Sequence, residues 1–235
     1  MGKRNTTIHI RYPKNKDHLT KTRIITSYFG FQLKKLYKIA SRAGTWLLRK
    51  LPKIYRHFTL HKISDIKTRI KEGVKWIKRK YGNKTYILSF QSDVKQMYTN
   101  LCTKEIMKAI NWLLNCMKKT CPKRKQYSEI LSVSKSAQIK YPHNVRWGRG
   151  TDYDNTTTVT FQDLKNIFTI DLKYSYTTAL GKLYYQKIGC PIGGYLSAFY
   201  ANVVCAYHEW CYISTLERKG IRIYGIRQMD DLLYG

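Results

Sequence analysis

Acidic residues are scarce in this chain. Its 235 residues include 14 Asp and Glu against 44 Lys and Arg, which gives a formal net charge of +30. Solubility requires far less charge, so the excess predicts a polyanionic partner, most simply a nucleic acid. Codon bias toward lysine is the alternative explanation, but it does not account for the small number of acids. The excess is also uneven, because residues 1–92 carry 24 Lys and Arg against three acids.

Long apolar runs and paired cysteines are also missing. No run reaches the ~18 apolar residues that a membrane-spanning helix needs, and the longest mostly apolar stretch, residues 195–207, contains polar side chains. The six cysteines have no CxxC spacing, and Cys116, Cys121 and His143 fit no common zinc site. These absences predict an intracellular protein with reduced thiols and no membrane segment.

The hydrophobic content is sufficient for folding. Apolar residues make up 43% of the sequence, so wholesale disorder is excluded and one large domain or two lobes with a packed core are expected.

Residues 7–12 and 22–26 have the alternation and the β-branched residues of two strands, and the lysines between them predict a phosphate-binding hairpin. An ordinary exposed hairpin is the alternative. Apolar spacing predicts a helix over residues 31–50, with a break at Gly44.

The next stretch contains two more helices around a strand. Ser64 is expected to be the N-cap of a helix that ends at Gly82. Residues 86–90 indicate a buried strand that leads directly into Asp93. Thr103 is expected to cap the following helix.

The remaining residues are less regular. Residues 118–160 are polar and basic and predict a loop or insertion. Residues 166–170 and 182–186 indicate a hairpin, and residues 196–216 indicate a long, largely apolar helix. Further strands are expected at residues 221–224 and 232–234.

A pair of adjacent carboxylates, Asp230 and Asp231, stands between apolar residues near the end of the sequence. The two anions repel each other, and their hydrophobic neighbours predict a partly buried strand. A divalent cation would make such a cluster tolerable, and a pair of cations can drive phosphoryl-type displacement. From this pair alone, a turn or cap with two solvated acids remains the alternative.

Three phrases of the sequence follow one another in an informative order. Residues 93–100 read Asp-Val-Lys-Gln-Met-Tyr-Thr-Asn, and residues 184–197 read Tyr-Tyr-Gln-Lys-Ile-Gly-Cys-Pro-Ile-Gly-Gly-Tyr-Leu-Ser. Residues 229–231 read Met-Asp-Asp. In this order, the phrases resemble motifs A, B and C of the reverse transcriptases, and they look most like the Penelope-like branch of that family.

The resemblance implies an α+β fold, in which a right-hand polymerase palm carries the acids on an antiparallel sheet beside a basic, helical fingers region. It places the fingers at residues 1–85 and the palm at residues 86–235, with a basic insertion at about residues 118–160. The family continues past motif C into a thumb, so we expect the thumb to be absent. The chain would then be a fragment, a repurposed copy, or a subunit whose thumb comes from a further chain.

The activity implied by the resemblance is RNA-directed DNA polymerisation, from a retroelement or a virus, with an RNA template, a DNA primer and dNTPs as partners. Asp93 and Asp230 would bind two Mg²⁺ ions and Asp231 would assist, and carboxylate oxygens are hard ligands that suit Mg²⁺. The alternative is a catalytically weak, nucleic-acid-binding remnant of such an enzyme. An RNA-templated RNA polymerase is disfavoured by Tyr98.

The resemblance also implies roles for residues outside the acids. Tyr98 would lie under the sugar and exclude a 2′-hydroxyl, and simple core packing is its alternative. Gly193 and Gly194 lack a Cβ atom, so the backbone there would approach a nucleotide closely, and a plain helix-start turn is their alternative. The remaining assignments are triphosphate binding by Arg23 and template binding by Gln186 and Ser197.

A second aspartate has the same local pattern as Asp93. Asp171 is also followed by a tyrosine five residues later, but only 18 positions separate it from Gly189, against 96 for Asp93. A palm must fit a helix and a returning strand into this interval, and an average helix alone takes ~11 residues. We therefore assign motif A to Asp93 and keep Asp171 as the fallback.

Overall fold

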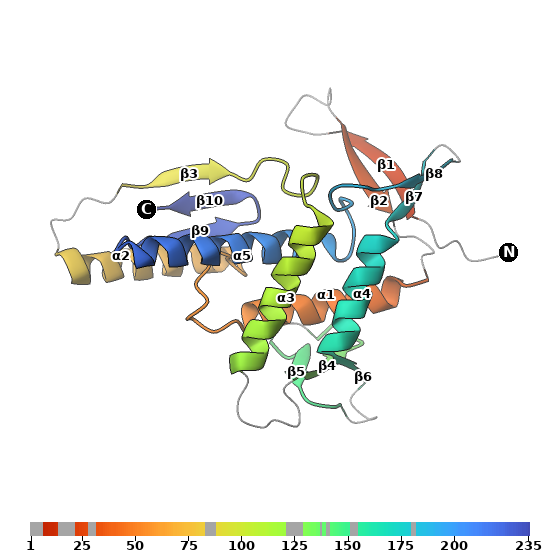
Figure 1. Cartoon of the computed structure of the whole chain (residues 1–235), viewed down its shortest axis with the longest axis horizontal. Coiled ribbons are helices and arrows are strands. Elements are labelled where there is room, and N and C mark those ends of the chain that lie inside the picture. Colours follow the sequence, from red (N-terminus) through yellow and green to blue (C-terminus); the bar gives the residue numbers. More distant parts are fainter. Residues whose placement is uncertain are drawn as a thin grey trace. The chain divides into compact units, whose positions relative to one another are not determined.

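The computed structural model describes residues 7–13, 22–27, 32–82, 88–120, 129–136, 138–139, 142–150, 155–179 and 182–235. The chain forms two compact units. The first unit comprises Met1–Leu51 and Tyr98–Tyr200, and the second comprises Pro52–Met97 and Ala201–Gly235. Both contain helices and strands, so the expected α+β class is confirmed (Figure 1). The division into fingers and palm stays a prediction.

Three helices form the core of the first unit. They are α1 (Lys34–Arg49), α3 (Thr103–Thr120) and α4 (Phe161–Lys173), and they correspond in part to the expected helices. The apolar face of α3 is fully buried at Ile106, Ile110 and Leu113, as its spacing predicts. The break expected at Gly44 is wrong, because α1 continues through this residue. A Cβ atom there would lie 2.7 Å from the ring of Phe199, so the glycine permits close packing.

A mixed sheet with the order β2-β1-β7-β8 belongs to the same unit. Strands β1 (Thr7–Pro13) and β2 (Thr22–Ser27) pair antiparallel, which confirms the first hairpin. Its connecting loop, with Lys14, Lys16 and Lys21, lies outside the described residues. Strand β1 also pairs parallel with β7 (Tyr176–Ala179), and β7 pairs antiparallel with β8 (Lys182–Tyr185).

Two expectations for residues 118–173 are wrong. Within the supposed irregular insertion, β4 (Ile130–Ser134), β5 (Val145–Trp147) and β6 (Thr156–Thr160) form an antiparallel sheet in the order β5-β4-β6. Residues 166–170, expected as a strand, lie inside α4. This helix begins with a capping box, in which the Thr160 hydroxyl accepts from the Asp163 N–H and the Asp163 carboxylate accepts from the Thr160 N–H.

The second unit has an antiparallel sheet in the order β3-β10-β9. Its strands are β3 (Phe90–Asp93), β9 (Gly225–Gln228) and β10 (Asp231–Tyr234). The strands expected at 86–90 and 221–224 are therefore displaced toward the C-terminus, although residues 83–87 lie outside the described part. Strand β3 is exposed rather than buried as expected.

Helices complete the second unit. A short 3-10 turn, η2 (Ile63–Asp65), precedes α2 (Ile66–Tyr81), so Asp65 rather than the expected Ser64 is the N-cap. The long helix α5 (Ser197–Arg218) begins in the first unit and continues into the second. Phe58, Ile213 and Ile223 form a buried cluster against which Leu216, Leu232 and Tyr234 pack. This cluster joins α5 to the sheet that carries Asp230 and Asp231.

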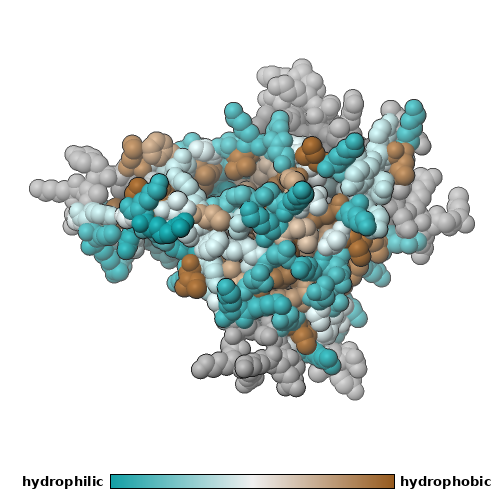
Figure 2. Space-filling view, viewed as in Figure 1, coloured by the Kyte–Doolittle hydropathy of each residue, from teal (hydrophilic) through white to brown (hydrophobic). Residues whose placement is uncertain are grey.

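Surface properties follow the composition. Strongly hydrophilic residues cover much of the visible face in the space-filling view (Figure 2), as expected for a chain with 44 Lys and Arg. Among the described residues, no helix is long and apolar enough to span a bilayer. The cysteines within the described part are free thiols, namely Cys102, Cys116, Cys190, Cys205 and Cys211. Cys121 lies outside it.

Candidate active site

The Asp pair lies at a tight turn between β9 and β10. Gln228 pairs with Asp231, so Met229 and Asp230 form a two-residue hairpin loop. Met229 has φ 56°, a left-handed conformation that glycine adopts easily and other residues rarely. Such backbone strain is of order 1–3 kcal/mol and persists only where the surroundings hold it in place. The turn that presents the carboxylates is therefore a constrained feature of the second unit.

Asp93 lies beside this turn. It is the last residue of β3 and pairs directly with Asp231, the first residue of β10. Residues that face each other across an antiparallel ladder have Cα atoms ~4.5–5.5 Å apart and side chains on the same face of the sheet. The backbone N–H of Val94 also donates to the Asp230 carbonyl, at 2.9 Å. The sheet register thus brings together the three residues that the motifs selected, although Asp93 and Asp230 are 137 positions apart in the sequence.

The three carboxylates are exposed, whereas their apolar neighbours had predicted a partly buried strand. In their present rotamers, no group of three or more His, Cys, Asp or Glu side chains within the described residues converges into a metal-binding cluster. The donor set nevertheless fits Mg²⁺, which prefers one or two carboxylates together with water and substrate oxygens. Asp93 and Asp231 are direct register partners in the sheet.

A buried arginine, Arg227, is hydrogen-bonded to the turn that carries the Asp pair. Arg227 is 1% exposed, and its Nε donates to the carboxylate of Glu209 on α5. Its Nη1 donates to Asn202 Oδ1 at 3.0 Å and to the Met229 carbonyl at 2.7 Å. Its Nη2 donates to the hydroxyl of Thr59 at 2.6 Å. One guanidinium therefore connects the acid-bearing turn to α5 and to residues 52–61.

Backbone hydrogen bonds reinforce this connection. The N–H of Arg227 donates to the Phe58 carbonyl, and the N–H of Leu60 donates to the Arg227 carbonyl. The N–H of Phe58 donates to the second oxygen of Glu209, at 2.9 Å. Burial, followed by the charges of His61, Arg227 and Arg69, lowers the pKa of the adjacent His57 to about 3. His57 is thus neutral at physiological pH and adds no positive charge next to Arg227.

The first unit carries the motif B loop. The N–H of Cys190 donates to the Tyr98 carbonyl at 2.7 Å, and the N–H of Gly189 donates to the Leu101 carbonyl at 2.9 Å. Gly189 has φ 84°, and a Cβ atom there would lie 2.6 Å from the Thr99 carbonyl oxygen. Only glycine fits this position. The loop is therefore fixed to the segment that contains Tyr98.

The other predicted residues of this unit have varied surroundings. Gly193 has φ 96° and Gly194 donates to the Pro191 carbonyl, so both belong to a turn before α5. Ser197 is buried, and its hydroxyl donates to the same carbonyl at 2.7 Å. Gln186 follows β8 and its side chain donates to the Ile188 carbonyl.

Arg23 lies in β2 opposite Tyr12. The contacts of its side chain fall outside the described part of the chain. The nucleotide and template roles of these residues stay predictions.

The fallback residue Asp171 lies near the end of α4 rather than at the end of a strand. The hydroxyl of Tyr200 donates to its carboxylate at 3.0 Å, and Tyr37 is a second hydrogen-bonding partner. Burial raises the pKa of Asp171 to about 6, and the hydrogen bonds from Tyr200 and Tyr37 oppose this rise. The residue is a partly buried member of the core of the first unit.

We expect Asp171→Asn to stabilise the protein at neutral pH. The folded pKa is raised above that of the unfolded chain, so the wild type loses stability as the pH rises from about 4 to about 6. The amide has no such titration and still accepts the tyrosine hydroxyls. The difference in the free energy of unfolding, from urea titrations at several pH values, should be near zero at pH 4 and on the order of 2 kcal/mol above pH 6. A difference independent of pH would contradict the assignment.

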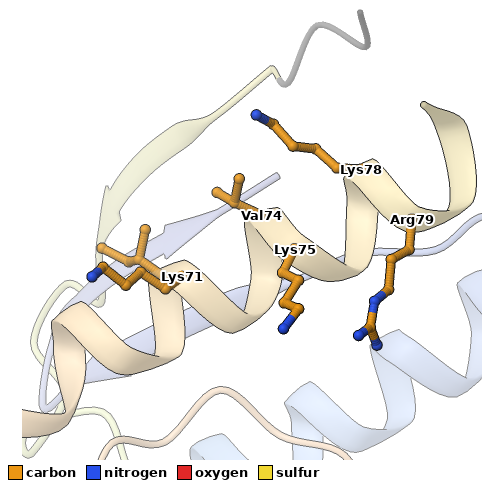
Figure 3. Close-up of a pocket in the computed structure, with 6 residues that line it drawn as sticks. Lys71, Val74, Lys75, Lys78 and Arg79 are labelled. Atoms are coloured by element: carbon orange, nitrogen blue, oxygen red, sulfur yellow. The ribbon is translucent and has the colours of Figure 1, made fainter. Parts of the chain in front are cut away.

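A basic row runs along α2. Lys67, Lys71, Lys75 and Arg79 are exposed at intervals of four residues, which corresponds to ~6 Å along the helix axis. An open groove of about 530 Å³ is lined by Ile70, Lys71, Val74, Lys75, Lys78 and Arg79, so that cations flank an apolar floor (Figure 3). Within the described residues, these cations are in no ion pair. The row fits a polyanion.

Sequence reasoning missed the network around Arg227. The only signals were a glutamate, Glu209, in a largely apolar helix of an acid-poor chain, and an arginine three residues before the Asp pair. Thr59 and Asn202 gave no signal. Gly189 was noticed as part of motif B, but its tight approach to Thr99 depends on a tertiary contact.

Comparisons with known proteins place the fold. No protein-family model and no curated protein sequence matches the chain. Among solved structures, it is similar to telomerase from Candida albicans in complex with a fragment of telomeric RNA, with a TM-score of 0.64 and 16% identity over 98% of the chain. It is also similar to apo telomerase from Candida tropicalis, with a TM-score of 0.67 and 14% identity over 99% of the chain.

These likenesses establish the fold. The chain spans 38% of the first telomerase structure and 39% of the second, so it corresponds to well under half of each. At 16% and 14% identity, the likeness concerns the fold alone.

Proposed function

We propose that this chain is the core of an RNA-directed DNA polymerase of the Penelope-like branch, with a palm that carries its acids. The observation that supports the proposal most directly is the register of the second unit, in which Asp93 pairs with Asp231 next to the turn at Asp230. Asp93 and the Asp230–Asp231 pair, which are distant from each other in sequence, meet at one end of these strands. The fold around them is shared with telomerase.

In the proposed reaction, a primer 3′-hydroxyl attacks the α-phosphate of a dNTP and pyrophosphate leaves. Asp93 and Asp230 would hold two Mg²⁺ ions, with assistance from Asp231, and the ions would lower the pKa of the hydroxyl and stabilise the charge on the leaving group. The chain itself supplies a rigid turn for these carboxylates. Because they are exposed, their oxygens are accessible to a metal ion and to water.

The first unit would bind and select the nucleotide. The ring of Tyr98 would exclude a 2′-hydroxyl, and the motif B loop bonded to its carbonyl would limit its movement. Gly193 and Gly194 would allow close approach of a nucleotide, and Arg23 would contact the triphosphate. Gln186 would contact the RNA template. Ser197 would contact the template as well, and its hydroxyl also donates to the Pro191 carbonyl.

Primer extension tests the proposal. The chain is incubated with a poly(rA)/oligo(dT) hybrid, Mg²⁺ and dTTP, and product length is followed on a gel. Extension that requires Mg²⁺ and dTTP supports the polymerase. Hybrid binding without any extension over a range of Mg²⁺ and Mn²⁺ concentrations would instead identify the second candidate, a nucleic-acid-binding remnant, which the charge of +30 favours.

The basic row of α2 is expected to contribute to nucleic-acid affinity. Changing Lys71, Lys75 and Lys78 to Gln removes three cations from the groove, so the slope of log K against log salt should fall by about 2–3. Fluorescence anisotropy of a labelled hybrid between 50 and 300 mM KCl measures this slope. The matched control changes three exposed lysines of α3, namely Lys104, Lys108 and Lys119. Equal losses for both triple variants would show that α2 has no special role.

A further inference from the structure

The turn that carries the Asp pair is strained and has no glycine. Met229 holds φ 56° in a two-residue hairpin loop, where its side chain is disfavoured. Such a conformation needs contacts that hold it. Two are present: the Met229 carbonyl accepts from Arg227 Nη1, and its sulfur accepts from Asn202 Nδ2 at 3.6 Å. The backbone of Met229 is thus held by Arg227 of β9 and its side chain by Asn202 of α5.

The geometry of the guanidinium explains why an arginine stands here. Its three nitrogens donate to four acceptors that come from α5, from residues 52–61 and from the turn itself. A lysine has a single nitrogen and cannot span these positions. The ion pair with Glu209 balances the buried charge, and a desolvated guanidinium that makes four hydrogen bonds has little freedom to move.

We propose that Arg227 is a positioning residue that fixes the carboxylates of Asp230 and Asp231 through the Met229 carbonyl. The proposal rests on the proposed function, because the geometry that it protects is that of the polymerase acids. Arg227 itself touches neither carboxylate in the structure and would touch no substrate. Its contribution is to keep the turn in its left-handed conformation, so that the acids meet Asp93 without reorganisation.

Testing this requires removing the contact while keeping the fold. Arg227→Met alone would leave Glu209 as an unpaired buried charge, which is strongly destabilising. The double variant Arg227→Met/Glu209→Gln removes both charges, and replacement of a buried ion pair by neutral groups is often neutral for stability. The new glutamine still offers an oxygen to the Phe58 N–H. The donors to the Met229 carbonyl, to Asn202 Oδ1 and to the Thr59 hydroxyl are lost, and of these three acceptors only the Met229 carbonyl belongs to the turn.

A second arginine–glutamate pair supplies the matched control. Arg56 pairs with Glu217 of α5 and also donates to the Ile223 carbonyl at 2.8 Å, so it too connects residues 52–61 with α5. Within the described residues, its hydrogen bonds and its ion pair reach Glu217 and Ile223 and none of Met229, Asp230 and Asp231. Arg56→Met/Glu217→Gln therefore makes the same chemical change in the same unit, away from the turn.

Three quantities are measured for each protein: primer-extension kinetics, Mn²⁺ binding from the free-ion EPR signal, and the thermal unfolding midpoint. For Arg227→Met/Glu209→Gln, we expect kcat to fall by about 10- to 100-fold, because a small displacement of the groups that take part in a reaction slows it by this order. This variant should also bind Mn²⁺ more weakly than the wild type. Its Kd for the hybrid and its unfolding midpoint should equal those of Arg56→Met/Glu217→Gln. Asn202→Ala, which keeps the ion pair, should give a smaller loss in the same direction.

The outcomes separate the inference from the proposed function. If the wild type neither extends primers nor binds Mn²⁺, the proposed function fails. If the wild type does both and the two double variants lose the same activity, the inference about Arg227 is wrong. Should Arg227→Met/Glu209→Gln not fold, Asn202→Ala decides: wild-type kcat and wild-type Mn²⁺ affinity in that variant would overturn the inference.

Discussion

Asp230→Asn should abolish primer extension without unfolding the protein. Asparagine has nearly the same shape, and Asp230 is exposed at the hairpin loop, so the sheet should be unaffected. A neutral amide removes the charge that would bind two Mg²⁺ ions. If metal stabilisation of the transition state falls by about 4 kcal/mol, the rate falls about a thousandfold. Extension of an oligo(dT) primer on poly(rA), compared at equal protein concentration, measures the loss.

The control for this variant comes from the same chain. Asp171→Asn makes the same chemical change at the residue with the competing motif pattern. Because Asp171 is a core residue bound to Tyr200, its amide variant should extend primers like the wild type. Asp93→Asn should behave like Asp230→Asn. Loss of extension in Asp171→Asn, with Asp93→Asn still active, would reverse the assignment of motif A.

Regular apolar spacing made several elements predictable. Helices α1, α3 and α5 have long apolar stripes or runs, so their existence followed from the sequence with errors of a few residues at the ends. The N-terminal hairpin followed from β-branched alternation. The motif acids were also found in this way, because Asp is rare here and each of the three stands beside a recognisable phrase.

Short elements that depend on tertiary pairing were not predictable in the same way. Strands β4, β5 and β6 have three to five residues each, and their sequences contain many Ser and Thr residues, whose hydroxyls also suit turns. They become strands because Leu131, Val133 and Val159 are buried in the first unit. Helix α4 was missed although its capping box, Thr160 with Asp163, was visible in the sequence.

The support for the candidate site was hidden for a different reason. Arg227 contacts Thr59, Asn202 and Glu209, which lie 168, 25 and 18 positions away. A local pattern cannot show a hydrogen-bond network that the fold assembles from three segments. In a chain with 44 Lys and Arg, no composition rule distinguishes the buried Arg227 from the other basic residues. Burial alone makes that distinction.

Glu209→Ala should be among the most destabilising single substitutions in the second unit. It leaves the guanidinium of Arg227 buried without a counter-charge and removes the acceptor for the Phe58 N–H. Breaking a buried ion pair by removing one partner typically costs about 3–5 kcal/mol. The free energy of unfolding, from urea denaturation monitored by far-UV circular dichroism, measures the loss.

The surface pair of Arg56 and Glu217 tests the physical reason for this loss. Glu217→Ala removes the same side chain from the same helix, but the pair is 34% and 40% exposed, so water can solvate the remaining guanidinium. Exposed ion pairs contribute only about 0–1 kcal/mol. A large difference between the two alanine variants would show that desolvation of Arg227, rather than the ion pair as such, makes Glu209 indispensable. Similar losses for both would mean that the network around Arg227 is solvated in solution, and the turn at Met229 would then lack the rigid support inferred for it.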